Sequence, residues 1–176
     1  MFSRSFPRLR PCKPAALIAL AALVAGCGSH ATAPVLRRAT GPSYHFAYPS
    51  GWRVTRTAWS VTAAGAGEEL VSVTVFRLAK RYQPALWPKV VPVLDGVAAQ
   101  LSSTLRGHVA ARSTTLVAGR RARSYEIEFR RDGKDLVERI VFLLDGRREY
   151  QLLCRFEPGG KPSAQCSDFL ATFRLA

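Results

Sequence analysis

The spacing of apolar and polar positions changes several times along the 176 residues. Residues 15–25 form one apolar run, which is shorter than the ~20 residues that a helix needs to cross a bilayer. From residue 44 onward, apolar positions mostly alternate with polar ones, which is typical of strands. Two later segments change to a helical period. The pattern therefore predicts a chain built mainly from strands, with two helices.

Runs rich in β-branched and aromatic residues predict the strands that precede the first helix. They cover residues 44–48, 52–60 and 70–78, and the glycine-rich segment 63–67 is expected to be a loop. The run 70–78 (LVSVTVFRL) is mostly β-branched, which favours burial on both faces. We expect this strand to lie inside the sheet.

Both predicted helices carry their apolar residues on one face. In 92–105 these residues are Val93, Leu94, Val97, Leu101 and Leu105. In 163–173 they are Cys166, Phe169, Leu170 and Phe173. Pro92 suits a first helical turn and Gly107 suits a C-terminal cap.

Two Asp-Gly pairs predict hairpin turns among the runs 113–117, 125–130, 136–143 and 150–156. A two-residue turn at Asp132-Gly133 places Glu126 opposite Arg139. At Asp145-Gly146 a three-residue turn pairs Ile140 with Leu152, whereas a two-residue turn pairs it with Gln151. Matching of apolar faces favours the three-residue turn. One face of the meander then carries the apolar side chains from Tyr125 to Cys154.

The apolar run 15–25 follows a basic segment without acids and ends in Val24-Ala25-Gly26-Cys27. This ending resembles the bacterial lipobox, which implies attachment of diacylglycerol to the Cys27 thiol, cleavage before Cys27 and acylation of the new N-terminus. The alternatives are an ordinary secretory signal with a coincidental cysteine, or a buried apolar helix. We predict a lipoprotein signal peptide over 1–26 and an extracytoplasmic chain that the lipid on Cys27 anchors to the bacterial cell membrane.

The segment after Cys27 mixes Gly, Ser, Ala, Thr and Pro without an apolar period, so 27–43 is predicted to be a lipidated tether and 44–176 a globular domain. Fully extended, the tether would reach roughly 50 Å from the anchor. Arg37 and Arg38 would then lie near the phospholipid surface.

The positive charge admits two interpretations. The net charge is +14, and residues 1–26 carry four positive charges and no negative ones, which leaves +10 for the rest. Such a balance draws a domain toward anionic lipid head groups, acidic wall polymers or nucleic acid. The arginines are dispersed along the sequence, however, which favours an ordinary solvated surface. The export signal argues against a nucleic-acid partner.

The four cysteines separate by position. Cys12 leaves with the signal peptide and Cys27 takes the lipid, so Cys154 and Cys166 remain. In an exported protein a remaining pair predicts a disulfide. Here it would connect the last strand to the terminal helix.

Candidate catalytic and metal-binding residues are sparse. Glu126 and Glu128 share one strand face, as paired carboxylates do in a glycosidase, but the pairing of Glu126 with Arg139 favours a cross-strand ion pair. The histidines do not share a ligand pattern with acids, so we predict no metal and no cofactor. Trp52, Trp59 and Trp87 are candidates for lining a ligand pocket, although Trp87 is expected to pack the first helix onto the sheet.

The chain resembles a known family over residues 44–175. The residues that carry the resemblance are the lipobox, the tether, Phe46-Ala47-Tyr48-Pro49-Ser50-Gly51-Trp52, the strand entry from Gly119 to Tyr125, and the terminal cysteine-containing helix. Together they resemble the PsbP-like lipoproteins, of the LpqN and LpqT type of actinobacteria. The resemblance implies an α+β fold, in which two helices flank an antiparallel sheet of about six or seven strands as an α/β/α sandwich. It also implies binding or accessory roles, without enzymatic activity.

Three functions follow from these observations. The first is a membrane-anchored, non-catalytic binding or accessory domain at the cell envelope, with an envelope protein or an anionic lipid as partner. The second is a carrier of a small ligand or lipid, with a pocket between sheet and helix lined by Trp52, Trp59 and Trp87. The third is an envelope hydrolase that uses Glu126 or Glu128.

Overall fold

A computed structural model of the chain describes residues 35–158 and 162–176. The predicted signal peptide and the predicted lipidation site Cys27 lie outside these residues and remain predictions. Residues Ala33–Ala176 form one compact unit. In the described parts of this unit, no helix is both long enough and apolar enough to cross a membrane.

Antiparallel strands make up most of the unit. They are β1 Leu36–Gly41, β2 Tyr44–Pro49, β3 Arg53–Arg56, β4 Ser60–Ala64, β5 Leu70–Arg77, β6 His108–Val117, β7 Arg120–Arg131, β8 Lys134–Asp145, β9 Arg148–Phe156 and β10 Arg174–Leu175. The helical elements are the short 3-10 helix η1 Pro84–Leu86, α1 Trp87–Thr104 and α2 Pro162–Thr172. Seven strands form one sheet in the order β3-β4-β5-β9-β8-β7-β6, and β1-β2-β10 form a second, smaller sheet.

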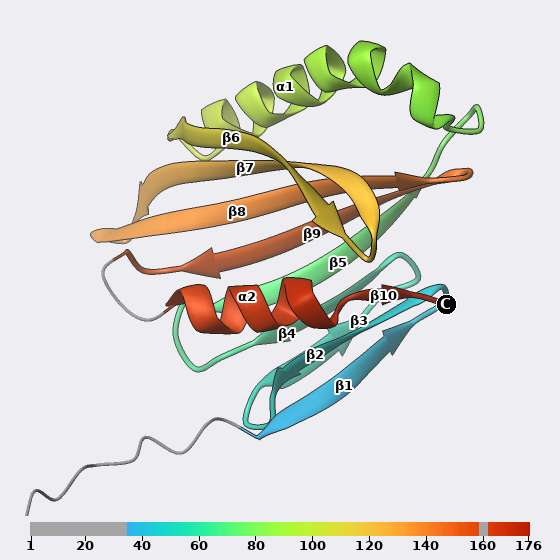
Figure 1. The fold of residues 1–176 in the computed structure, drawn as a ribbon. Coiled ribbons are helices and arrows are strands. Elements are labelled where there is room, and N and C mark those ends of the chain that lie inside the picture. Colours follow the sequence, from blue (N-terminus) through green and yellow to red (C-terminus); the bar gives the residue numbers. More distant parts are fainter. Residues whose placement is uncertain (1–34, 159–161) are drawn as a thin grey trace, which may run out of the picture. The chain divides into compact units, whose positions relative to one another are not determined.

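The large sheet is covered on both faces. Figure 1 shows α1 along one face, and α2 with the small sheet along the other. Under α1, a core cluster joins Trp87 and Leu94 to Ile127, Ile140 and other side chains of β7 and β8. On the opposite face, a larger cluster joins the small sheet and α2 to alternate side chains of β4, β5, β8 and β9. The predicted α+β fold, an antiparallel sheet of seven strands with two helices, is confirmed.

Several predicted element bounds were wrong. The run 52–60 is not one strand, because the chain turns at Thr57–Ser60, where the Thr57 amide donates to the Ser60 carbonyl. Strand β4 then extends into the segment expected to be a glycine-rich loop. Helix α1 begins at Trp87, so Pro92 lies inside the helix, and Pro88 occupies its first turn instead.

The tether prediction needs a correction for residues 36–41. They form β1, which pairs antiparallel with β2 from Leu36–Pro49 to Gly41–Tyr44. This strand packs against the domain because Ala39 is fully buried in the core, although its neighbours Arg37 and Arg38 are exposed. Only residues 28–35 separate Cys27 from β1, which limits the extended reach to about 28 Å.

The register predicted for the second hairpin was also wrong. Ile140 pairs with Leu153 and Leu143 pairs with Tyr150, and a two-residue loop, Gly146–Arg147, joins the strands. Neither alternative drawn from the sequence has this register. Tyr150 and Leu152 therefore lie on the face covered by α2, opposite to Ile140. The first hairpin has the predicted register, with Glu126 opposite Arg139.

The disulfide between Cys154 and Cys166 is confirmed, with a Cα–Cα distance of 5.7 Å. Both cysteines are buried in the cluster beneath α2. The bond therefore attaches the terminal helix to β9 from within the core.

Candidate functional site

A groove of about 360 Å³ with a mainly polar lining lies between α2 and the β6–β7 hairpin. Strand β6 of this hairpin is the edge strand of the large sheet. Hydroxyl side chains of Ser113, Thr115 and Ser124 line the groove beside Glu126 and Arg139. Leu170 and Ala171 of α2 form its apolar side. We refer to this cavity as the hydroxyl groove.

An ion pair occupies the floor of the hydroxyl groove. Arg139 donates from Nε and Nη2 to Oε1 of Glu126, at 3.0 and 2.6 Å. The Arg139 side chain is about three-quarters buried, at 26% exposed, and its Nη1 lies 4.0 Å from Sγ of Cys166. Because one oxygen of the Glu126 carboxylate already accepts two charge-assisted hydrogen bonds, this carboxylate is poorly placed to act as a base.

Glu128, the second carboxylate of the predicted pair, lies outside the groove. Its Oε2 is 3.5 Å from Nε2 of His108, and both side chains are more than half exposed. The two glutamates therefore have separate partners on neighbouring strands, as the ion-pair interpretation expects for Glu126. The structure does not place them around a common reacting position.

The three candidate tryptophans are not brought together. Trp52 is partly buried against the cluster beneath α2, whereas Trp87 is buried in the cluster beneath α1, on the opposite face of the sheet. Trp59 lies at the turn between β3 and β4 and lines a different cavity. Trp87 packs α1 onto the sheet, as predicted. The other two keep only a predicted role in ligand binding.

A second polar cluster attaches α1 to β7. Oδ1 of Asp95 accepts from the Tyr125 hydroxyl at 2.5 Å and from Nη2 of Arg123 at 3.0 Å. These hydrogen bonds, chiefly that from Tyr125, hold the pKa of Asp95 below its usual value. Burial, together with the Asp95 bond, raises the pKa of Tyr125 to about 12. Tyr125 stays protonated at neutral pH, so this cluster is a structural link.

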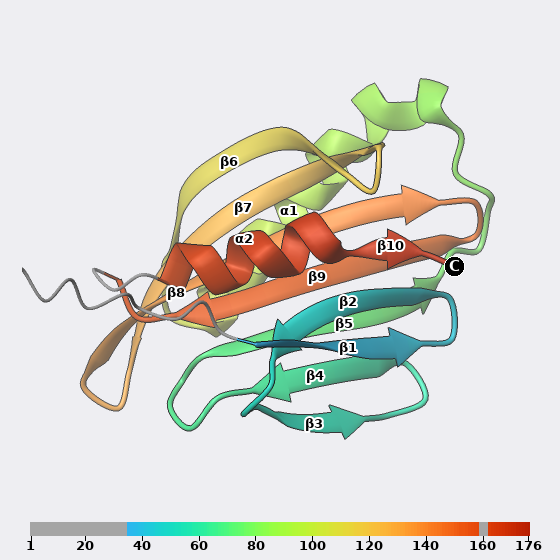
Figure 2. The ribbon, with the colours of Figure 1, turned by 60° about the horizontal axis from the view of Figure 1, so that its bottom comes forward.

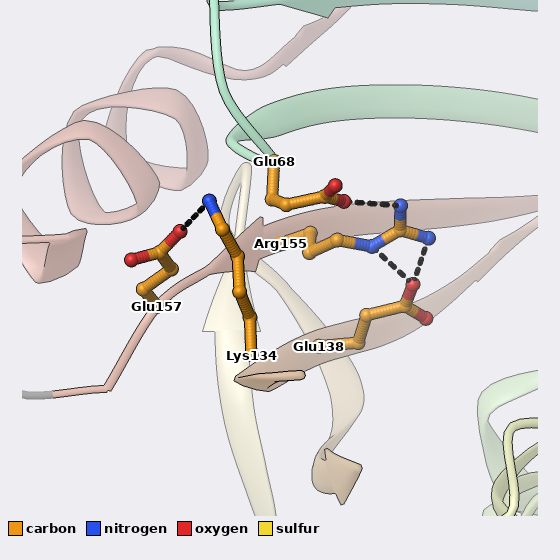
Figure 3. Close-up of polar contacts among 5 residues, drawn as sticks. All are labelled: Glu68, Lys134, Glu138, Arg155 and Glu157. Carbon is orange, nitrogen blue, oxygen red and sulfur yellow. Dashed lines mark hydrogen bonds and ion pairs between the residues drawn. The ribbon is translucent and has the colours of Figure 1, made fainter. Parts of the chain in front are cut away.

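A third cluster closes one end of the large sheet (Figure 3). Arg155 of β9 donates from Nε to Oε1 of Glu138 at 2.8 Å and also donates to it from Nη2. Its Nη1 lies 3.8 Å from Oε2 of Glu68 in the loop before β5. The Glu138 side chain is only 4% exposed. Because this carboxylate is almost fully buried and is paired within the fold, the cluster links β8 to β9 and is not a candidate ligand site.

In the described parts of the chain, no group of three or more His, Cys, Asp or Glu side chains is placed to hold a metal ion. The hydroxyl groove was not predicted from the sequence. Strand β6 carries polar residues on both faces, which is typical of an uncovered edge strand and could have indicated an exposed surface there.

Comparison with known proteins gives fold likenesses. No family model matches the chain, and no curated protein matches its sequence. The solution structure of cyanobacterial PsbP (CyanoP) from Synechocystis sp. PCC 6803 is 12% identical with a TM-score of 0.57, over 87% of this chain and 99% of that one.

Two further structures are more distant. A crystal structure from Bacteroides thetaiotaomicron is 12% identical with a TM-score of 0.52, over 76% of this chain, which spans only 45% of that protein. LpqN of Mycobacterium tuberculosis, a protein involved in cell envelope biogenesis, is 10% identical with a TM-score of 0.47, over 80% of this chain and 91% of that one. The fold described above, matched along the whole of CyanoP, is therefore the PsbP-like fold.

Proposed function

We propose that this chain is a lipid-anchored, non-catalytic binding domain at the outer face of a bacterial cell membrane. The observation that carries the proposal is the position of the lipobox cysteine, nine residues before the first residue of β1. A diacylglycerol and a further acyl chain on Cys27 hold a protein far more firmly than one chain does. The short connection then keeps the domain within about 30 Å of the bilayer surface.

The hydroxyl groove supports binding over catalysis. Glu126 and Arg139 neutralise each other, which leaves the exposed Arg112 and the hydroxyl groups, which donate and accept hydrogen bonds, for a partner. Such a lining suits a polar partner, a peptide segment or a glycan, that exchanges hydrogen bonds with it. The hydrolase alternative loses support because Glu126 and Glu128 are paired separately.

The anchor is tested in bacterial cells that process lipoproteins. The full chain is labelled with a clickable palmitate analogue and its intact mass is measured after detergent extraction. We expect labelled protein that begins at Cys27, and no label in the Cys27→Ser variant. Protein that begins at another residue and carries no fatty acid would refute the anchor.

The binding role is tested by a photo-crosslinking amino acid placed at Thr115, in the hydroxyl groove. The matched control places the same group at Thr55, an exposed threonine of β3 outside the groove. A discrete adduct formed in intact cells from position 115, and not from position 55, supports the proposal. Equal labelling from both positions contradicts a specific site.

A further inference from the structure

One end of the folded unit collects cationic side chains from four separate segments. They come from the end of β5, the segment after it, the β6–β7 turn and the β8–β9 turn. We call this surface the arginine end, and it consists of Arg77, Lys80, Arg81, Arg120, Arg121, Arg147 and Arg148, all exposed. In Figures 1 and 2 these turns lie together, at the end opposite to the start of β1.

Backbone hydrogen bonds hold the segments of the arginine end in place. The Leu78 amide donates to the Arg147 carbonyl at 2.9 Å, and the Tyr82 amide donates to the Gly146 carbonyl at 2.7 Å. Register places Arg77 opposite Arg148 on adjacent strands. Like charges directly opposite each other are destabilising, so this pairing is retained at a cost to the fold.

Two cavities of about 480 Å³ each meet at this end. Arg77, Arg147 and Arg148 line one of them, and Arg81, Arg120 and Arg121 line the other. Asp145 is the acid that the two linings share, and it lies 3.3 Å from Arg120. The positive charge of the linings is therefore largely uncompensated.

Large apolar side chains are exposed among these cations. Trp59 is 68% exposed, Phe76 47% and Leu116 72%. Trp59 and Phe76 line the cavity that contains Arg77, and Leu116 pairs across the strands with Arg121. The backbone at Trp59 is fixed, because its carbonyl accepts from the Val75 amide at 2.9 Å. Aromatic residues next to arginines are characteristic of surfaces that contact the lipid–water interface.

The opposite end of the sheet has a different charge pattern. There the carboxylates of Glu68, Glu138 and Glu157 pair with Arg155 and Lys134 (Figure 3). The arginines are dispersed in the sequence, but seven cationic side chains from four segments meet at this end, where Asp145 is the acid that lines both cavities.

We propose that the arginine end docks on an anionic lipid bilayer, with guanidinium groups on the phosphates and Trp59 and Phe76 in the interfacial layer. The inference rests on the proposed function, because it requires a domain that faces a membrane surface. A soluble polyanion would use the arginines and leave the exposed apolar side chains without a role, so charge and exposure together favour lipid. The start of β1 and the arginine end lie at opposite ends of the sheet, and a strand as long as β8 extends about 40 Å. Both contacts together orient the domain lengthwise on the membrane.

The experiment measures sedimentation of residues 28–176 with lipid vesicles. This segment lacks Cys27 and includes the whole compact unit that begins at Ala33, with its core and its disulfide. Phosphatidylcholine vesicles are compared with vesicles that contain about 30 mol% phosphatidylglycerol, at about 0.1 M salt. We expect binding to the anionic vesicles alone. Equal binding to both vesicles, or to neither, overturns the proposal.

The variants locate the surface. At ~1 kcal/mol for each cation, Arg77→Gln/Arg147→Gln/Arg148→Gln is expected to weaken vesicle binding about 100-fold. Trp59→Ser is expected to weaken it about tenfold, from the loss of apolar burial. If inorganic polyphosphate binds with the same arginine dependence, while Trp59→Ser leaves vesicle binding unchanged, the ligand is a soluble polyanion and the lipid proposal is wrong.

A matched control removes the same charge elsewhere. Arg53→Gln/Arg106→Gln/Arg130→Gln changes three exposed arginines outside the two cavities, and we expect less than a threefold effect, roughly, because charges beyond ~10 Å are screened. An equal loss in both triple variants would show that only net charge matters and would overturn the proposal. Because this chain carries no lipid, a failure here is independent of the palmitate-labelling result.

Discussion

Replacing Arg155 by methionine tests the buried ion pair at the end of β8 and β9. The Glu138 and Arg155 side chains are 4% and 16% exposed, so removal of the guanidinium leaves a carboxylate that water hardly reaches. Breaking a buried pair in this way costs about 3–5 kcal/mol. Methionine keeps an apolar contact with Phe129, whose ring centroid lies 5.8 Å from Cζ of Arg155. The loss of stability in Arg155→Met therefore measures chiefly the cost of leaving the Glu138 carboxylate buried without a partner.

The expected loss is large for a domain of this size. Stability of small domains is typically about 5–15 kcal/mol, and each kcal/mol corresponds to roughly 3–4 °C in Tm. Arg155→Met should therefore lower Tm by about 10–20 °C. The assay is equilibrium unfolding in urea, monitored by tryptophan fluorescence and by circular dichroism. The slope m of the free energy of unfolding against urea concentration should be the same in wild type and variant.

Three matched variants separate burial of charge from simple loss of a contact. Glu68→Gln removes the longer contact, 3.8 Å, to a side chain that is 29% exposed, and should cost at most ~1 kcal/mol. Lys134→Met removes the exposed pair with Glu157 shown in Figure 3 and should cause no measurable change. The double variant Glu138→Met/Arg155→Met should recover most of the wild-type stability. The reasoning fails if Arg155→Met costs no more than Glu68→Gln, or if the double variant is no more stable than Arg155→Met.

Three other perturbations have distinct signatures. Cys154→Ala/Cys166→Ala should lower the free energy of unfolding by about 3 kcal/mol, a difference that should largely vanish on addition of reductant; a persistent difference would point to packing. Asp95→Asn should cost ~1.5–3 kcal/mol at neutral pH. Because its hydrogen bond from Tyr125 lowers the pKa of Asp95, this cost should shrink as the pH falls through that lowered pKa, and a pH-independent cost would contradict the assignment. Burial raises the pKa of Glu149, so the protonated side chain stabilises the fold, and this stability is lost as the pH rises through that pKa. Glu149→Gln should therefore raise the free energy of unfolding at pH ~7 and not at pH ~4. Urea titrations at both pH values measure the difference.

The two hairpins show where local sequence is sufficient. At the first turn both Asp132 and Gly133 have positive φ, 50° and 79°, as a two-residue turn of type I′ requires, and the predicted register is correct. At the second turn only Gly146, with φ of 58°, has positive φ, and the turn lies one residue later. The Asp-Gly pair is compatible with both placements. Matching of apolar faces could not distinguish them, because the sheet is buried on both sides and either register buries apolar residues.

Gly107 shows the same limit for a single residue. Its position after the helix suits a C-terminal cap, yet Arg106 has the positive φ there, 56°. A Cβ at Gly107 would lie 2.2 Å from the Glu128 carbonyl oxygen. The close approach of β7 therefore requires the glycine, and no local pattern reveals that approach.

By itself, the sequence determined the strongly periodic elements, the pairing of Glu126 with Arg139, the cysteine pair and the fold class. The elements and the Glu126–Arg139 pairing depend on side-chain alternation and turn residues, which act between neighbours in the chain, whereas the cysteine pair was predicted from the export signal and the fold class from the family resemblance. The lipobox is also a local feature, and lipidation of Cys27 stays a prediction. The tertiary structure alone decided that residues 36–41 form a strand, that Trp52 and Trp87 lie on opposite faces, and that arginines from four segments share one end. Each of these depends on contacts between residues distant in sequence, because burial against the rest of the fold, not local preference, selects them.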